Sequence, residues 1–83
     1  MEAEIIETPL KRERIKNGIS IRGLARAVNT SPSEILRLEK GERLGILFVW
    51  CKLWNYFNWS VEDFTDIIYE HYTMFTGMEE KYE

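Results

Sequence analysis

Apolar and polar residues recur with helical periodicity along most of the chain, and short polar or glycine-containing segments separate the periodic stretches. In the first stretch Leu10 and Arg14 lie on neighbouring turns, after Thr8-Pro9 and before Asn17-Gly18. A threonine followed by a first-turn proline is typical of a helix N-terminus, and Asn-Gly is typical of a helix end. The pattern predicts a first helix that is capped at Thr8 and ends at Lys16.

Two short helices joined by a turn are predicted next. Ser20 precedes an apolar stripe at three- and four-residue steps over Ile21–Val28, and Asn29-Thr30 forms the turn. Ser31-Pro32-Ser33-Glu34 combines a capping box with a proline at the first helical position, so that Ser31 accepts the Glu34 N–H and the Glu34 side chain reaches back. A third helix therefore opens here and ends near Lys40-Gly41.

Two longer apolar stretches predict a fourth and a fifth helix. The fourth, over about residues 44–57, is apolar nearly all round, and the fifth is capped by Ser60 and Asp63 and runs to about Thr76, before Gly77. The residues expected to face inward are Trp50, Leu53, Trp54, Phe57, Val61, Phe64, Ile68, Tyr72 and Phe75. We therefore expect an all-α, five-helix fold.

The length and composition favour one small domain. With 45% hydrophobic residues, residues 1–83 can bury one core over about residues 8–76, with a short N-terminal arm and a frayed C-terminal tail. Cys51 is the single cysteine, so no disulfide framework is expected, and its apolar surroundings predict a small core residue. The acidic N-terminus differs from a signal peptide and residues 46–50 are too few to span a bilayer, so we expect a cytoplasmic protein without a membrane partner.

The charged residues are segregated, although the formal net charge is only −3. Residues 9–43 contain nine Lys and Arg against four Asp and Glu, whereas residues 44–83 contain two bases and seven acids. A basic segment attracts phosphates, and an acidic end keeps a protein soluble and repels DNA. The alternative, an ordinary surface of mixed charge, is less favoured because nine bases fall within one segment.

Two short capped helices joined by a tight turn are typical of a helix-turn-helix, here from Ser20 to Glu39. The chain resembles the lambda-repressor/Cro-like family at residues 10–20 (LKRERIKNGIS), Leu24-Ala25, Ser31, Ile35, residues 37–41 (RLEKG), Arg43, Phe57, Trp59-Ser60 and Phe64. The resemblance implies a lambda-repressor-like DNA-binding domain and an ion pair between Arg14 and Glu39. It also indicates a transcriptional regulator, a repressor of the phage or mobile-element type, that binds a palindromic operator in double-stranded DNA as a homodimer.

On this interpretation the third helix faces the major groove with the residues that lie off its Ile35/Leu38 core face. Arg37 is the candidate for guanine, because its fork can contact O6 and N7 together. Phosphates would be held by arginine and lysine side chains near the helix ends. The candidate DNA-binding residues are Arg22, Ser31, Pro32, Ser33, Leu36, Arg37, Lys40 and Arg43.

Four residues depart from the family pattern. Ile21 stands where the family usually carries a glutamine that touches phosphate, and Leu36 stands where a polar base-facing residue is common. Glu34 and Glu42 place acids near expected phosphates, although capping can satisfy Glu34 and Leu36 can contact a thymine methyl. The departures leave a second hypothesis open, a protein-binding module of the same fold that holds another regulator or a polymerase subunit.

The fourth helix carries more apolar residues than one core can bury. The surplus residues, expected to form a dimer or partner interface, are Ile46, Phe48, Val49 and Tyr56. The lone His71 is expected at the surface or in that interface, and Glu62, Asp63 and Asp66 are interpreted as the solvated start of the fifth helix. With one histidine, one cysteine and no glycine-rich phosphate loop, we expect no enzyme, no cofactor and no metal site.

Overall fold

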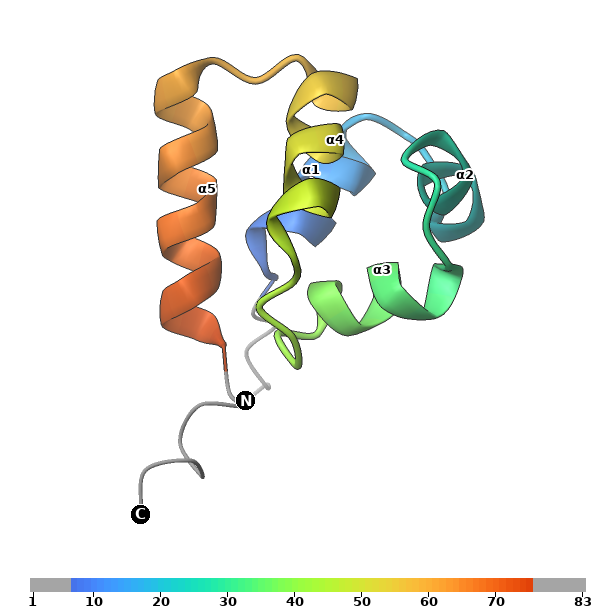
Figure 1. Cartoon of the computed structure of the whole chain (residues 1–83), viewed down its shortest axis with the longest axis horizontal. Helices are drawn as coiled ribbons and strands as arrows, with labels where there is room; N and C mark the ends of the chain where they lie inside the picture. Colours follow the sequence, from blue (N-terminus) through green and yellow to red (C-terminus); the bar gives the residue numbers. More distant parts are fainter. Residues whose placement is uncertain (1–6, 76–83) are drawn as a thin grey trace, which may run out of the picture.

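The computed structural model describes residues 7–75, which form five helices and no strand (Figure 1). The helices are α1 (Pro9–Lys16), α2 (Ile21–Ala27), α3 (Pro32–Glu39), α4 (Leu47–Phe57) and α5 (Val61–Met74). The predicted all-α, five-helix fold is confirmed. Thr76 and Gly77, expected at the end of the last helix, lie outside the described residues.

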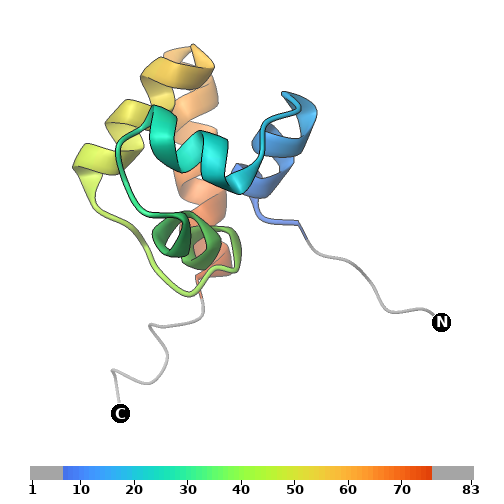
Figure 2. The same cartoon turned by 90° about the vertical axis from the view of Figure 1, so that its right-hand side faces the viewer.

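The helices form two groups that share α1. On one side α2 and α3 pack together, and on the other side α4 and α5 run in opposite directions (Figures 1 and 2). Large rings occupy the space between α4 and α5: the Trp54 and Phe64 rings stack with centroids 4.3 Å apart, and Trp50 meets His71 edge-on at 5.1 Å. Because α1 contacts both α3 and α5, it links the two groups.

Serine caps fix where most of the helices begin. The Ser20 hydroxyl accepts the Gly23 N–H at 2.9 Å at the start of α2. At the start of α5, the Ser60 hydroxyl accepts the Asp63 N–H and the Asp63 carboxylate accepts the Ser60 N–H, which is a complete capping box. The predicted start of α5 is therefore confirmed.

Two other caps differ from the prediction. Ser31 accepts the Glu34 N–H at 3.1 Å, but the Glu34 carboxylate pairs with Arg43 instead of reaching back, so the predicted reciprocal box at α3 is wrong. Thr8 occupies the N-cap position of α1, yet its buried hydroxyl donates to the Glu39 carbonyl at 2.7 Å. A long-range bond that joins α1 to the end of α3 thus replaces the local cap.

The α4 helix begins at Leu47, three residues later than about residue 44, because the preceding chain turns at Gly45 (φ +87°). A Cβ at this position would lie 2.6 Å from the Trp50 Nε1 atom and 2.8 Å from a Leu38 methyl carbon, so only glycine fits. Cys51 is exposed on the outer side of α4, and its predicted core position is wrong.

The inward face of α5 is rotated from the predicted stripe. Ile67 and His71 are buried, whereas Val61 and Tyr72 are 64% and 49% exposed. Phe64 and Ile68 belong to both the predicted and the observed stripe and are partly buried. Because a histidine was not counted as a core residue, the sequence pattern selected the wrong one of two overlapping stripes.

Candidate DNA-binding face

The outer side of α3 carries the residues that the sequence placed toward DNA. Ile35 and Leu38 are fully buried, which fixes the rotation of the helix and leaves its other side in solvent. The candidate DNA-binding residues are all exposed: Arg22, Ser31, Pro32, Ser33, Leu36, Arg37, Lys40 and Arg43. Figure 2 shows α2 and α3 together on the side of the molecule that faces the viewer.

Most of the cations on this face have no acidic partner among residues 7–75, and the same holds for Lys11 on α1 and Lys52 on α4. Arg22 and Arg26 on α2, with Arg37 and Lys40 on and after α3, form no ion pair with an acid among residues 7–75. Four other cations in this range are paired: Arg12 with Glu70, Arg14 with Glu39, Lys16 with Glu13 and Arg43 with Glu34. The unpaired charges on α2 and α3 remain available to phosphates.

Arg43 is exposed and has an acidic partner. Its Nη1 atom lies 3.2 Å from a Glu34 carboxylate oxygen, so the charge expected to hold phosphate is partly neutralised. Its backbone carbonyl accepts a hydrogen bond from His71 Nε2 at 2.7 Å. The loop after α3 is therefore attached to α5, and any phosphate contact by Arg43 is made from a fixed backbone.

His71 is buried rather than exposed, so its predicted surface position is wrong. The side chain is 2% exposed, and burial lowers the pKa of His71 below its ordinary value, which the hydrogen bond to Arg43 partly opposes. Since the carbonyl can only accept, Nε2 carries the proton and Nδ1 has no hydrogen-bond partner among the described residues. The ring is thus a neutral core group.

The ion pair between Arg14 and Glu39 is present. Arg14 Nε donates to Glu39 Oε2 and Arg14 Nη2 donates to Oε1 at 3.2 Å, with the two side chains 14% and 3% exposed. Arg14 Nη1 also donates to the Ile19 carbonyl at 3.0 Å. One guanidinium therefore ties α1 to the end of α3 and to the chain that enters α2, which sets the position of the exposed α3 face.

A family model of the helix-turn-helix matches residues 10–46. This segment is a helix-turn-helix of the lambda-repressor/Cro-like kind. Proteins of this family are DNA-binding regulators of transcription, and the five helices form the lambda-repressor-like fold that the sequence predicted. The match ends before α4, and comparison with curated proteins and with solved structures gave no significant match.

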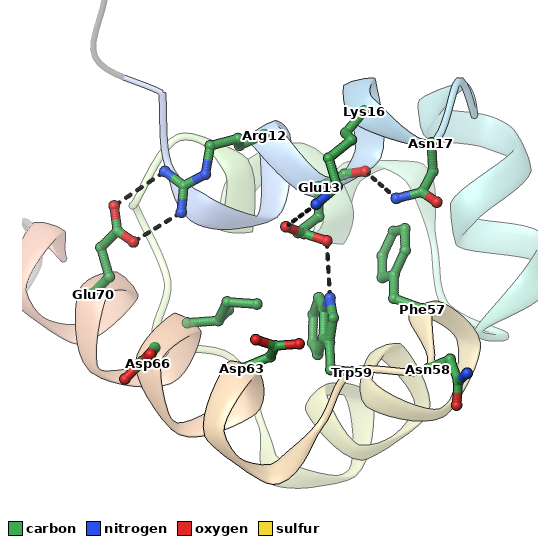
Figure 3. Close-up of a pocket in the computed structure, with 11 residues that line it drawn as sticks. Arg12, Glu13, Lys16, Asn17, Phe57, Asn58, Trp59, Asp63, Asp66 and Glu70 are labelled. Atoms are coloured by element: carbon green, nitrogen blue, oxygen red, sulfur yellow. Dashed lines mark hydrogen bonds and ion pairs between the residues drawn. The ribbon is translucent and has the colours of Figure 1, made fainter.

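A polar groove of about 360 Å³ separates α1 from α5, on another part of the surface (Figure 3). Arg12 binds Glu70 through both η nitrogens, and this hydrogen bonding lowers the pKa of Glu70. Glu13 accepts from Trp59 Nε1 at 3.0 Å and pairs with Lys16. The groove carries interhelical pairs, and within residues 7–75 no group of three His, Cys, Asp or Glu side chains is arranged to hold a metal.

The expected interface residues do not share one environment. Ile46, Phe48 and Tyr56 are 62%, 66% and 43% exposed, but Val49 is buried at 7%, so its placement on an outer surface is wrong. Leu47, the first residue of α4, is 72% exposed to solvent. None of the helices between residues 7 and 75 has the length and apolar character that a membrane span requires.

Two exposed residues were missed by the sequence interpretation. Arg26 lies one turn after Arg22 on α2, and both are exposed. The four-residue spacing could have identified it, because residues four apart share one side of a helix. Leu47 could not be found in this way, since its exposure depends on the turn at Gly45.

Proposed function

We propose that this protein binds a palindromic operator as a dimer, with the exposed side of α3 in the major groove, and acts in the cytoplasm as a phage- or mobile-element-type repressor. The observation that carries the proposal is the set of unpaired cations on and beside the helix-turn-helix. Arg22, Arg37 and Lys40 are exposed there without an acidic partner among the described residues, whereas Arg12, Arg14 and Lys16 on α1 are paired with glutamates. Such a surface gives sequence-independent attraction to phosphate.

Within this face the proposed roles follow from side-chain chemistry. Arg37 contacts guanine O6 and N7, Leu36 contacts a thymine methyl, and Pro32 and Ser33 line the groove beside them. Phosphates are bound by Arg22, Lys40 and Arg43 at the helix ends, with the Ser31 hydroxyl beside them. Two copies related by a two-fold axis would place their α3 helices about 34 Å apart, one turn of DNA.

The test begins with a titration of the full chain against random-sequence duplex DNA at several salt concentrations, followed by selection of tightly bound sequences. We expect Arg37→Ala to lose about 1–3 kcal/mol of base discrimination at one position per half-site. Lys40→Ala should instead weaken all sequences alike and make the salt dependence shallower by about one unit. Retained specificity in Arg37→Ala would remove this residue from base recognition.

A second candidate function is a protein-binding module of the same fold. It is favoured by the apolar side chains in solvent, with Leu36 on α3 at 40% and Ile46 near α4 at 62% exposure. On this hypothesis another regulator or a polymerase subunit covers these residues. Wild-type protein that shows no salt-dependent binding to DNA would favour this function over the first.

A further inference from the structure

A pocket of about 300 Å³ opens on α2, beside the turn that leads to α3. Its lining consists of Arg22, Ala25, Arg26, Thr30 and Pro32. Ala25 is buried and has only a methyl side chain, so the space between the two arginines is not filled by a larger residue. Pro32, the first residue of α3, brings the pocket to the edge of the proposed DNA-binding face.

The two arginines are like charges one helical turn apart, a spacing at which they repel. The α2 helix contains no acid, and among residues 7–75 no acid forms an ion pair with Arg22 or Arg26. Elsewhere the fold pairs arginine with glutamate, as at Arg14 and Glu39. The repulsion in the pocket is therefore uncompensated by the protein, and an anion between the two guanidinium groups would remove it.

A third hydrogen-bond donor lines the same pocket. The Thr30 N–H is already bonded to the Ala25 carbonyl at 2.9 Å, but the Thr30 hydroxyl has no hydrogen-bond partner among the described residues. Two guanidinium groups and one hydroxyl therefore line the same pocket as hydrogen-bond donors. A tetrahedral phosphate, which has several acceptor oxygens and a negative charge, matches these donors.

We propose that this pocket binds one phosphate of the DNA backbone, with Arg22 and Arg26 on either side of it and the Thr30 hydroxyl as a third donor. The proposal rests on the proposed DNA-binding function and adds Arg26 and Thr30 to it. Because α2 lies next to α3, a phosphate fixed here sets the position of the α3 face along the duplex. The contact supplies affinity and register but no base preference.

The experiment measures binding of the full chain to a random-sequence duplex over a range of salt concentrations. Arg26→Gln should make the slope of log K against log salt shallower by less than one unit and weaken binding by less than about eightfold at 0.1 M salt, because Arg22 still contacts the phosphate. The double variant Arg22→Gln/Arg26→Gln should lose about one unit in total, because both arginines neutralise the same phosphate. The control is Lys11→Gln, which removes one positive charge from α1, outside the pocket. It should change the slope of log K against log salt less than Arg26→Gln does. Circular dichroism and thermal melting check that each variant is folded.

Each of the following outcomes would contradict one part of the proposal. If wild type binds with a steep salt slope and Arg26→Gln is unchanged, the pocket is wrong and the proposed function stands. If the double variant loses two units, the arginines contact separate phosphates. If inorganic phosphate raises the melting temperature of wild type but not of Arg26→Gln, at matched ionic strength, while DNA binding is unaffected, the pocket binds a free anion. If wild type does not bind DNA, both proposals fail.

Discussion

The two groups of helices use different residues for the same task of filling a small core. Around α2 and α3 the buried side chains are aliphatic, including Leu24, Val28, Ile35 and Leu38, and the outer surface carries unpaired cations. Between α4 and α5 the core combines tryptophan, phenylalanine and histidine rings with the aliphatic side chains of Val49, Leu53 and Ile67, and large apolar residues remain in solvent. The first surface fits a polyanion, whereas the second fits another apolar surface.

The α1 helix shows this difference within two residues. Arg14 and Arg12 both form two hydrogen bonds to a glutamate, but Arg14 reaches Glu39 in the helix-turn-helix group and Arg12 reaches Glu70 on α5. The first pair is nearly enclosed, while the side chains of the second are 44% and 41% exposed. Similar ion pairs therefore carry very different weight in the two groups.

The largest expected effect comes from breaking the enclosed pair. Arg14→Met keeps an apolar stem but leaves the Glu39 carboxylate, 3% exposed, without its cation. Breaking a buried pair from one side typically costs about 3–5 kcal/mol, since the remaining charge stays desolvated. Urea unfolding followed by circular dichroism measures this loss in the free energy of unfolding.

Arg12→Met is the matched control, because it removes the same side chain from the same helix. Its pair with Glu70 is screened by solvent, so we expect a loss below about 1 kcal/mol. Equal losses in the two variants would contradict the distinction between the two groups. A larger loss in Arg12→Met would show that the groove between α1 and α5, rather than the Arg14 contact, holds α1 in place.

The two groups also differed in how far sequence predicted them. Serine caps and three- and four-residue steps identified α2 and α3 to within a residue or two, because Leu24, Ile35 and Leu38 form unambiguous stripes. In α4 nearly every position is large and apolar, so periodicity alone could not choose its buried side. Val49 was misplaced for this reason, and His71 was misplaced because a histidine was not counted as a core residue.

For the candidate site, exposure was predictable and pairing was not. All eight candidate DNA-binding residues are in solvent, as the helical spacing required. The contact between Arg43 and Glu34 spans nine residues and depends on the path of the loop after α3. This path is fixed by two hydrogen bonds, one from His71 to the Arg43 carbonyl and one from Trp50 to the Leu44 carbonyl. No local pattern in the sequence encodes that path.

A smaller effect is expected at the apolar surface formed by Ile46, Leu47 and Phe48 at the start of α4, where the question is what covers these side chains. If it is a second copy, Phe48→Glu places two carboxylates in one two-fold interface, where both must lose their water. The dissociation constant should rise about thirtyfold or more, which corresponds to about 2 kcal/mol. Light scattering over a concentration series measures the change, and circular dichroism should show an intact helical fold because Phe48 is 66% exposed.

Val61→Glu is the control for this variant, since Val61 is 64% exposed and lies at the start of α5, where an acid is favoured by the helix dipole. It should leave the oligomeric state unchanged. Wild-type protein that is monomeric at high concentration would rule out the homodimer. Loss of helical structure in Phe48→Glu would show instead that the Phe48 ring supports the core. The Lys52 ammonium lies 4.7 Å from the centre of this ring, so this contact would also be lost.

The smallest effect concerns the contact that joins the two groups, from His71 on α5 to the Arg43 carbonyl after α3. Burial lowers the pKa of His71 below 6.5 in the folded state, so at mildly acidic pH the unfolded chain binds a proton that the folded protein excludes. The stabilisation is complete above about pH 6.5 and declines as the pH falls toward the lower folded pKa. Urea unfolding at a series of pH values between 7.5 and 5 should show this decline.

The His71→Gln variant identifies the group responsible. Glutamine can still donate to the Arg43 carbonyl but does not titrate, and the chain has no other histidine, so the decline between pH 6.5 and 5 should be absent from this variant. Glu70 acts in a separate window, because its pKa is lowered by Arg12 and its contribution is lost only as the pH falls below about 4.5. A decline of equal size in His71→Gln would assign the effect to carboxylates, and would mean that the seam between the two groups does not respond to mild acid.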